Sequence, residues 1–126
     1  MQIIDTKEAP GAIGPYSQAV FTDDLMFISG QVAIDPQTGQ LVTTSIKAEC
    51  EQVLQNIGAI VKAAGIPLGN VVKTTIFLQD MNDFSAVNAI YGAFFAKPYP
   101  ARSTVAVAKL PLGARVEIEA IVRLPR

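Results

Sequence analysis

The sequence predicts an α+β domain in which a mixed sheet carries two helices on one face. Three observations support this class. Short runs typical of strands flank two segments of helical periodicity, in the order ββ, long helix, β, shorter helix, ββ. Proline and glycine stand singly between these segments, without linker or internal repeat, so one domain is expected. Only 17% of the residues are charged, against about 25% on average, so the uncovered sheet face is expected to pack against other subunits in a closed ring.

Two strands are expected near the N-terminus, over residues 16–23 and 25–33. Short apolar runs mark both strands, and Thr22-Asp23-Asp24 forms the turn between them. Gly30 interrupts the second strand. Residues 35–39 contain a proline to set φ and a glycine to accept a positive φ, so they predict a turn.

Helical spacing marks two later segments. The first runs from Ser45, which can cap its start, to Ala64, and Gly65 ends it. The second begins at Asn82-Asp83 and ends before Pro98, and its aromatic side chains indicate core packing rather than a stacking platform for bases. One face of the first helix carries Ile46, Cys50, Val53, Leu54, Ile57, Ile60, Val61 and Ala64, which makes the cysteine a small buried hydrophobe rather than a reactive thiol.

The remaining strands lie on either side of the second helix. Residues 71–78 alternate as a strand does, and residues 102–108 and 115–124 predict a hairpin joined by residues 109–114. Pairing of Ala108 with Arg115 would place on one sheet face Arg102, Thr104, Ala106, Glu117 and Glu119.

The composition excludes several kinds of catalytic site. The chain has no histidine, so a Ser/His/Asp triad, a Cys–His dyad and a histidine-containing zinc or copper site are excluded. Its one cysteine excludes internal disulfides and cysteine-rich metal sites. The lone GxxG at 11–14 indicates a flexible turn before Tyr16. Glu117 and Glu119 have no third carboxylate nearby in the sequence, so no metal site is expected.

The charge balance and the hydropathy limit partners and location. The net charge is −1 and the sequence pI is about 5.3, without the basic excess that neutralises phosphates, so nucleic acid is not expected as a partner. The first residues resemble neither a signal peptide nor a transit peptide. No window approaches the roughly 18 consecutive apolar residues of a membrane span. A cytoplasmic location is expected, in agreement with the free thiol.

Arg102 is the most informative single residue. It stands where a strand begins, and Lys97 is the one other charged residue within six positions on either side. A guanidinium in such surroundings requires an anion. Two interpretations stay open. Arg102 forms an ion pair with Glu117 or Glu119, or it captures a substrate carboxylate while a carboxyl group on the same face orients a water molecule.

Six short motifs stand in one order along the chain: IGPYSQ at 13–18, ISGQ at 28–31, VKTTIFL at 72–78, MNDF at 81–84, PARS at 100–103 and VEIEA at 116–120. Together they closely resemble the Rid (reactive intermediate deaminase, YjgF-like) family, from about residue 4 to the C-terminus. The resemblance implies one Rid-family domain over residues 1–126, with a chorismate-mutase-like subunit. It also implies a homotrimer whose sheets form a central barrel, with ligand sites in clefts between subunits.

The same resemblance implies an activity. Members of the family hydrolyse reactive imines and enamines, such as 2-iminopropanoate and 2-iminobutanoate, to 2-oxo acids and ammonia, with no metal or cofactor. Carried over by motif, Arg102 would bind the substrate carboxylate and Glu117 would hold the attacking water. Further pocket residues would be Tyr16, Gly30, Asn88 and Thr104, the last through its backbone carbonyl.

Two positions depart from the family pattern. Thr104 stands where the deaminase subgroup usually has cysteine, and its β-branch could change the pocket volume or the substrate range. Ala106 stands where many relatives have glutamate. Two other functions stay open: an RNA-cleaving translation inhibitor, which the acidic pI disfavours, and a non-catalytic trimer that binds small carboxylates.

Overall fold

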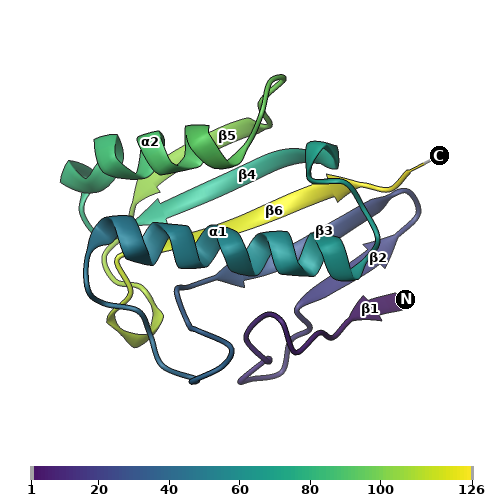
Figure 1. Cartoon of the computed structure of the whole chain (residues 1–126), viewed down its shortest axis with the longest axis horizontal. Helices are drawn as coiled ribbons and strands as arrows, with labels where there is room; N and C mark the ends of the chain where they lie inside the picture. Colours follow the sequence, from purple (N-terminus) through teal and green to yellow (C-terminus); the bar gives the residue numbers. More distant parts are fainter. Residues whose placement is uncertain (1, 126) are drawn as a thin grey trace.

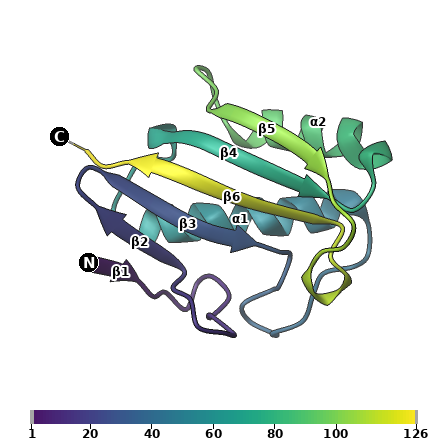
Figure 2. The same cartoon turned by 180° about the vertical axis from the view of Figure 1, so that it is seen from behind.

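A six-stranded sheet with two helices on one face forms the structure, as the sequence predicts (Figure 1). The computed structural model describes residues 2–125. Strands lie in the order β1-β2-β3-β6-β4-β5, antiparallel except for the parallel pair β4–β5. Figure 2 shows the opposite face of the sheet with no helix over it. The elements are β1 (Gln2–Ile4), β2 (Ala19–Thr22), β3 (Leu25–Gln31), α1 (Ile46–Ala63), β4 (Val71–Leu78), α2 (Phe84–Phe94), β5 (Ala101–Ala106) and β6 (Val116–Arg123).

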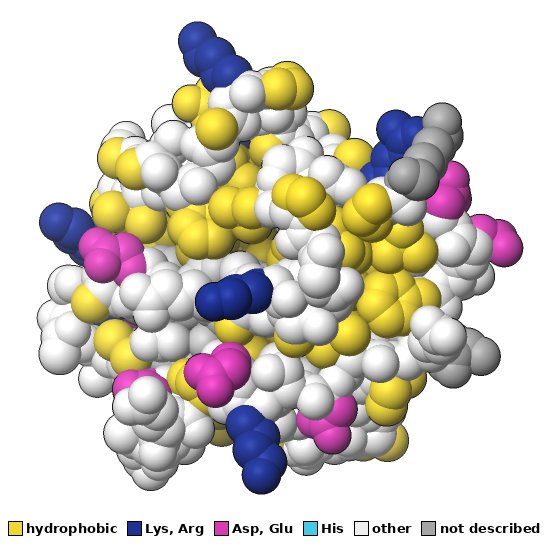
Figure 3. Space-filling view, turned by 45° about the vertical axis from the view of Figure 1, so that its right-hand side comes forward, with side chains coloured by type: hydrophobic (Ala, Val, Ile, Leu, Met, Phe, Trp, Pro, Cys, Tyr) yellow, Lys and Arg dark blue, Asp and Glu magenta, His cyan; other side chains and the backbone are white. Residues whose placement is uncertain are grey.

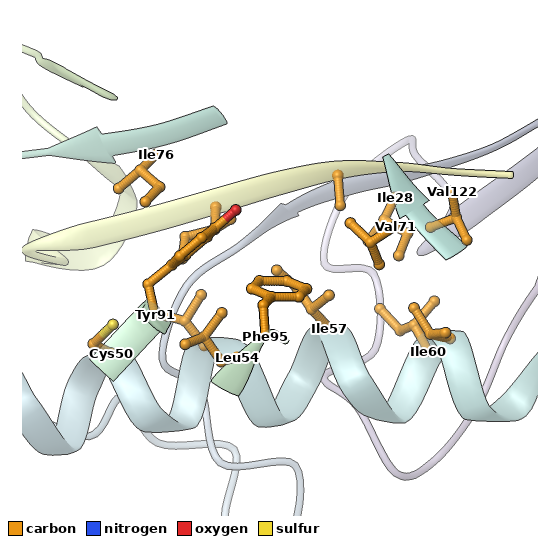
Figure 4. Close-up of a cluster of buried hydrophobic side chains, with 14 of the residues drawn as sticks. Ile28, Cys50, Leu54, Ile57, Ile60, Val71, Ile76, Tyr91, Phe95 and Val122 are labelled. Atoms are coloured by element: carbon orange, nitrogen blue, oxygen red, sulfur yellow. The ribbon is translucent and has the colours of Figure 1, made fainter. Parts of the chain in front are cut away.

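The first helix and its core face agree with the sequence pattern. Ser45 caps α1, and its hydroxyl accepts a hydrogen bond from the Ala48 amide at 3.0 Å. Gly65 follows the helix with a φ of 73°. Cys50 is fully buried, and burial raises the pKa of its thiol to about 12, so it packs as a hydrophobe. Figure 4 shows the apolar face of α1 pointing toward the sheet.

The predicted C-terminal hairpin is wrong. β5 pairs with β4 in parallel, and β6 lies between β3 and β4. The cause is that α2 returns the chain from the end of β4 to its start, and such a crossover makes successive strands parallel. The loop after β5 then passes the end of β4, where Val107 N donates to Leu78 O and Gln79 N donates to Arg115 O.

The corrected register separates residues that were expected to share a face. Arg102 lies opposite Thr74, which lies opposite Ala120, so all three point to the helix-covered face. Glu117 lies opposite Phe77, on the uncovered face. The prediction that Arg102 and Thr104 share a face with Glu117 and Glu119 is therefore wrong.

Smaller differences concern the ends of strands. β1 was not predicted, because three residues are too short for a clear alternation. β2 begins at Ala19 rather than at residue 16, since the segment before it is a loop held by side-chain hydrogen bonds. The turn at 35–39 is confirmed by a hydrogen bond from Gly39 N to Asp35 O.

The surface shows how few charges the chain has. Hydrophobic side chains form broad patches in Figure 3, and most charged groups stand toward the rim of that view. On the uncovered sheet face, Phe27 is 39% exposed and Val105 is 43% exposed. No helix within residues 2–125 is long and apolar enough to cross a membrane.

Candidate active site

Arg102 lies on aromatic rings at the edge of the sheet. It is the second residue of β5, and its side chain extends toward α2. The guanidinium carbon is 4.9 Å from the ring centroid of Tyr91 and 5.7 Å from that of Phe84. Among residues 2–125 the one ion pair joins Glu49 and Arg115, so no carboxylate of that part of the chain neutralises Arg102.

A surface cavity of about 460 Å³ opens beside Arg102. It lies between α2 and the segment that leads into β5. Asn88, an exposed residue of α2, lines the cavity together with Tyr91 and Tyr99. Arg102 and Asn88, two of the predicted site residues, are therefore neighbours.

Glu117 lies against the backbone of Gly30. A Cβ atom on Gly30 would come within 2.9 Å of Glu117 Cδ and 3.1 Å of Oε1, so only glycine leaves room for the carboxyl group. A β-bulge between Ile28 and Gln31 brings Gly30 to this place. Burial raises the pKa of Glu117, and the nearby charge of Glu119 raises it further.

Tyr16 stands in a loop that hydrogen bonds tie to the residue before Gly30. Its hydroxyl accepts a hydrogen bond from Ile13 N at 3.3 Å, and its side chain is 48% exposed. The next residue, Ser17, accepts a hydrogen bond through its carbonyl from the Ser29 hydroxyl at 2.6 Å. Because Ser29 precedes Gly30, this bond ties the Tyr16 loop to the bulge. We call Gly30 and Glu117 the glutamate cluster.

Gln18 holds the start of that loop. Its side chain is 2% exposed, and its amide oxygen accepts from Thr6 N at 2.7 Å. The amide nitrogen donates to Thr6 O at 3.0 Å and to Pro10 O at 2.8 Å. A buried amide with this many backbone partners fixes the path of the chain from residue 6 to Tyr16.

Thr104 lies on the helix-covered face, two residues after Arg102. It pairs with Ile76 of β4, and its hydroxyl is buried without a hydrogen-bond partner in the part of the chain that the structure describes. The same part of the chain has no group of three side chains suited to a metal ion.

Comparisons with known proteins identify the family of the chain. The family model described as Endoribonuclease L-PSP matches residues 6–124. The chain belongs to that family. It is 53% identical to the human protein named 2-iminobutanoate/2-iminopropanoate deaminase, over 95% of this chain and 88% of the relative. The resemblance to Rid proteins is thereby confirmed.

Solved structures of similar proteins have the same fold. E. coli TdcF with bound serine superposes with a TM-score of 0.95 at 43% identity, over 99% of this chain and 100% of that one. RidA from the Antarctic bacterium Psychrobacter superposes with a TM-score of 0.94 at 47% identity, over 98% and 100%. The serine bound to TdcF is a small molecule that carries a carboxylate.

The sequence did not reveal the contact between Arg102 and Tyr91. Tyr91 belongs to an apolar helical stripe that predicts a core residue, and its 3% exposure confirms that prediction. The contact of Tyr91 with Arg102 depends on the pairing of β4 with β5, which no local pattern specifies. Gln18 ends the IGPYSQ motif, but the motif does not predict that its side chain is buried, because a glutamine in a loop is usually exposed.

Proposed function

We propose that this protein hydrolyses small 2-imino acids, such as 2-iminobutanoate and 2-iminopropanoate, to 2-oxo acids and ammonia. The observation that carries the proposal is the Arg102 guanidinium, which lies on two aromatic rings without a carboxylate partner among residues 2–125. Such a group suits the carboxylate that every 2-imino acid has. The name of the human relative supports the same reaction class.

In the proposed mechanism, Arg102 binds the substrate carboxylate and fixes the C=N carbon near a water molecule held by Glu117. The water oxygen bonds to that carbon while Glu117 accepts a water proton, which gives a carbinolamine. Glu117 returns the proton to the nitrogen and then accepts the hydroxyl proton of the carbinolamine as the C–N bond breaks and the carbonyl forms. Ammonia leaves and takes that proton as ammonium, which restores the Glu117 carboxylate. The raised pKa of Glu117 makes it a stronger base for the first step. The iminium carbon is already electrophilic, so this scheme requires neither a metal nor a cofactor.

The site proposed here is formed by two subunits. Arg102 points to the helix-covered face and Glu117 to the uncovered face of the same sheet, so one substrate reaches both only if they come from different copies. The apolar uncovered face, with Phe27 and Val105 exposed, is suited to the interior of a closed ring. We therefore propose the homotrimer that the resemblance implies.

The other site residues have supporting roles in this scheme. Asn88 lines the cavity beside Arg102. The Thr104 carbonyl would bind the imine nitrogen or the water, as the family resemblance implies. Gly30 gives Glu117 its room, and Tyr16, whose loop is tied to Ser29, would line the pocket beside the glutamate cluster.

A coupled assay tests the proposal. Threonine dehydratase supplies 2-iminobutanoate, and the rate of its hydrolysis is compared with the rate in buffer. Arg102→Lys keeps the charge but loses the two-pronged guanidinium, so the rate is expected to fall at least about 100-fold, with the trimer intact by size-exclusion chromatography. Wild-type turnover in this variant contradicts the proposal.

Two further outcomes separate the alternatives. Binding of 2-oxobutanoate without faster imine hydrolysis would make the protein a non-catalytic carboxylate-binding trimer. RNA cleavage is measured on the same preparations, and cleavage that persists in Arg102→Ala would identify a copurifying nuclease.

A further inference from the structure

The ring beneath Arg102 is fixed at both ends. Tyr91 is buried in α2, and its hydroxyl shares a 2.7 Å hydrogen bond with the hydroxyl of Thr74, a fully buried residue of β4. Phe95 packs against the same ring, with a centroid distance of 4.7 Å. Figure 4 shows the Tyr91 ring rising from α2 toward the sheet. The ring therefore has one position relative to β4.

The sheet register joins this anchor to Arg102. Thr74 and Arg102 are direct partners in the parallel pairing of β4 with β5. Thr74 holds the far end of the Tyr91 ring, and Arg102 places its guanidinium 4.9 Å from the centre of that ring. Three residues from two adjacent strands and one helix thus form a closed set of contacts, which we call the arginine clamp.

The arginine clamp affects which donors of Arg102 remain free. A ring under the flat face of a guanidinium leaves the N–H groups at its edge available, and these are the groups that bind a carboxylate in bidentate geometry. Burial raises the pKa of the Tyr91 hydroxyl, so it stays neutral and does not compete as an anion for Arg102.

We infer that Tyr91 and Thr74 are positioning residues: their hydrogen bond fixes the ring that holds Arg102 ready for a substrate carboxylate. This inference rests on the function proposed above, in which Arg102 binds that carboxylate. Thr74 is fully buried and does not touch the substrate, and Tyr91, which lines the cavity with 3% of its surface exposed, acts through Arg102.

Four variants test the arginine clamp: Tyr91→Phe, Thr74→Val, the double variant, and Tyr91→Leu. The first two remove one hydroxyl each, and KM for 2-iminobutanoate is expected to rise about two- to fourfold. The double variant is expected to be no worse than the poorer single one, because both lose the same bond. Tyr91→Leu removes the ring, and KM is expected to rise about tenfold, by more than kcat falls.

A matched control separates positioning from simple loss of stability. Ile60→Val removes one buried methylene from α1, at a residue that Figure 4 shows apart from Tyr91. It is expected to lower the Tm while KM stays at the wild-type value. Calorimetry gives the Kd of 2-oxobutanoate, a carboxylate probe that needs no turnover, for every variant.

Proton NMR of the Arg102 Nε–H group reports the clamp directly. The ring current of Tyr91, the nearer of the two rings, is expected to shift this signal in the wild type, and the shift is expected to become smaller in Tyr91→Leu, where only Phe84 remains. An Arg102 signal or a 2-oxobutanoate Kd that is unchanged in Tyr91→Leu overturns the inference.

The two proposals fail in different ways. Absent imine hydrolysis with intact 2-oxobutanoate binding contradicts the proposed function, while the Kd and the NMR shift still decide on the arginine clamp. Normal hydrolysis with KM unchanged in Tyr91→Leu contradicts the clamp alone. Absence of both hydrolysis and carboxylate binding in the wild type contradicts both.

Discussion

Position 30 requires glycine because the carboxyl group of Glu117 occupies the space that a side chain at this position would take. Gly30→Ala puts a Cβ 2.9 Å from Glu117 Cδ, so the carboxyl group must move. We expect imine hydrolysis to fall about tenfold or more, since a shift of about 1 Å in a reacting group is costly. Gly69→Ala is the matched control, because nothing lies within 4 Å of its added Cβ. Equal activity of the two variants would contradict this role for Gly30.

Glu117 gives a prediction about pH. Its pKa is raised in the folded protein, so the folded state holds a proton that the unfolded state has already lost, and stability decreases as pH rises through the window between the two values. Glu117→Gln is therefore expected to have a higher Tm than the wild type at pH 7, with the difference vanishing near about pH 4. Thermal melts across this range measure it, with the exposed Glu8→Gln as control. A wild type that melts above Glu117→Gln at pH 7 would show that the ionised carboxylate is stabilising.

At the scale of elements, Glu49 joins the first turn of α1 to the start of β6. It is 1% exposed, and its carboxylate accepts from Arg115 N at 2.6 Å, Arg115 Nε at 2.9 Å and Val116 N at 3.3 Å. Glu49→Gln turns an NH₂ group toward these donors, so we expect the free energy of unfolding to decrease by about 2–3 kcal/mol in urea titrations. Glu51→Gln, in the same helical turn, is the control and is expected to change it by about 0.5 kcal/mol or less. If the two variants unfold at the same urea concentration, Glu49 is not the anchor described here.

The sequence predicts the helices better than it predicts the pairing of the strands. Both helices could be predicted, since caps such as Ser45 and the 3.6-residue period are local signals. The partner of β5 could not, because pairing with β4 or with β6 depends on how α2 carries the chain across the sheet. That one choice decides the face of Arg102. The uncharged sequence around Arg102 indicates that this residue is functional. Its position relative to Glu117 could not be predicted from the sequence.

At the scale of the whole molecule, the proposed two-subunit site gives a mixing prediction. Arg102→Lys and Glu117→Gln are each expected to be inactive alone. Trimers reassembled from equal amounts of both contain some interfaces with one intact Arg102 and one intact Glu117, and random assembly makes these about a quarter of all interfaces. We therefore expect about a quarter of the wild-type rate after joint unfolding and refolding. If the mixed trimers hydrolyse the imine no faster than the separate variants do, each site lies within one subunit.

The opposite orientation of Arg102 and Glu117 also has a consequence for a chain that has just been made. In the proposed assembly a lone chain holds both reacting groups but cannot direct them at one molecule. Imine hydrolysis would then begin only when copies meet, and at low abundance the rate would rise more steeply than the amount of protein. Dilution alone would silence such an enzyme without any inhibitor.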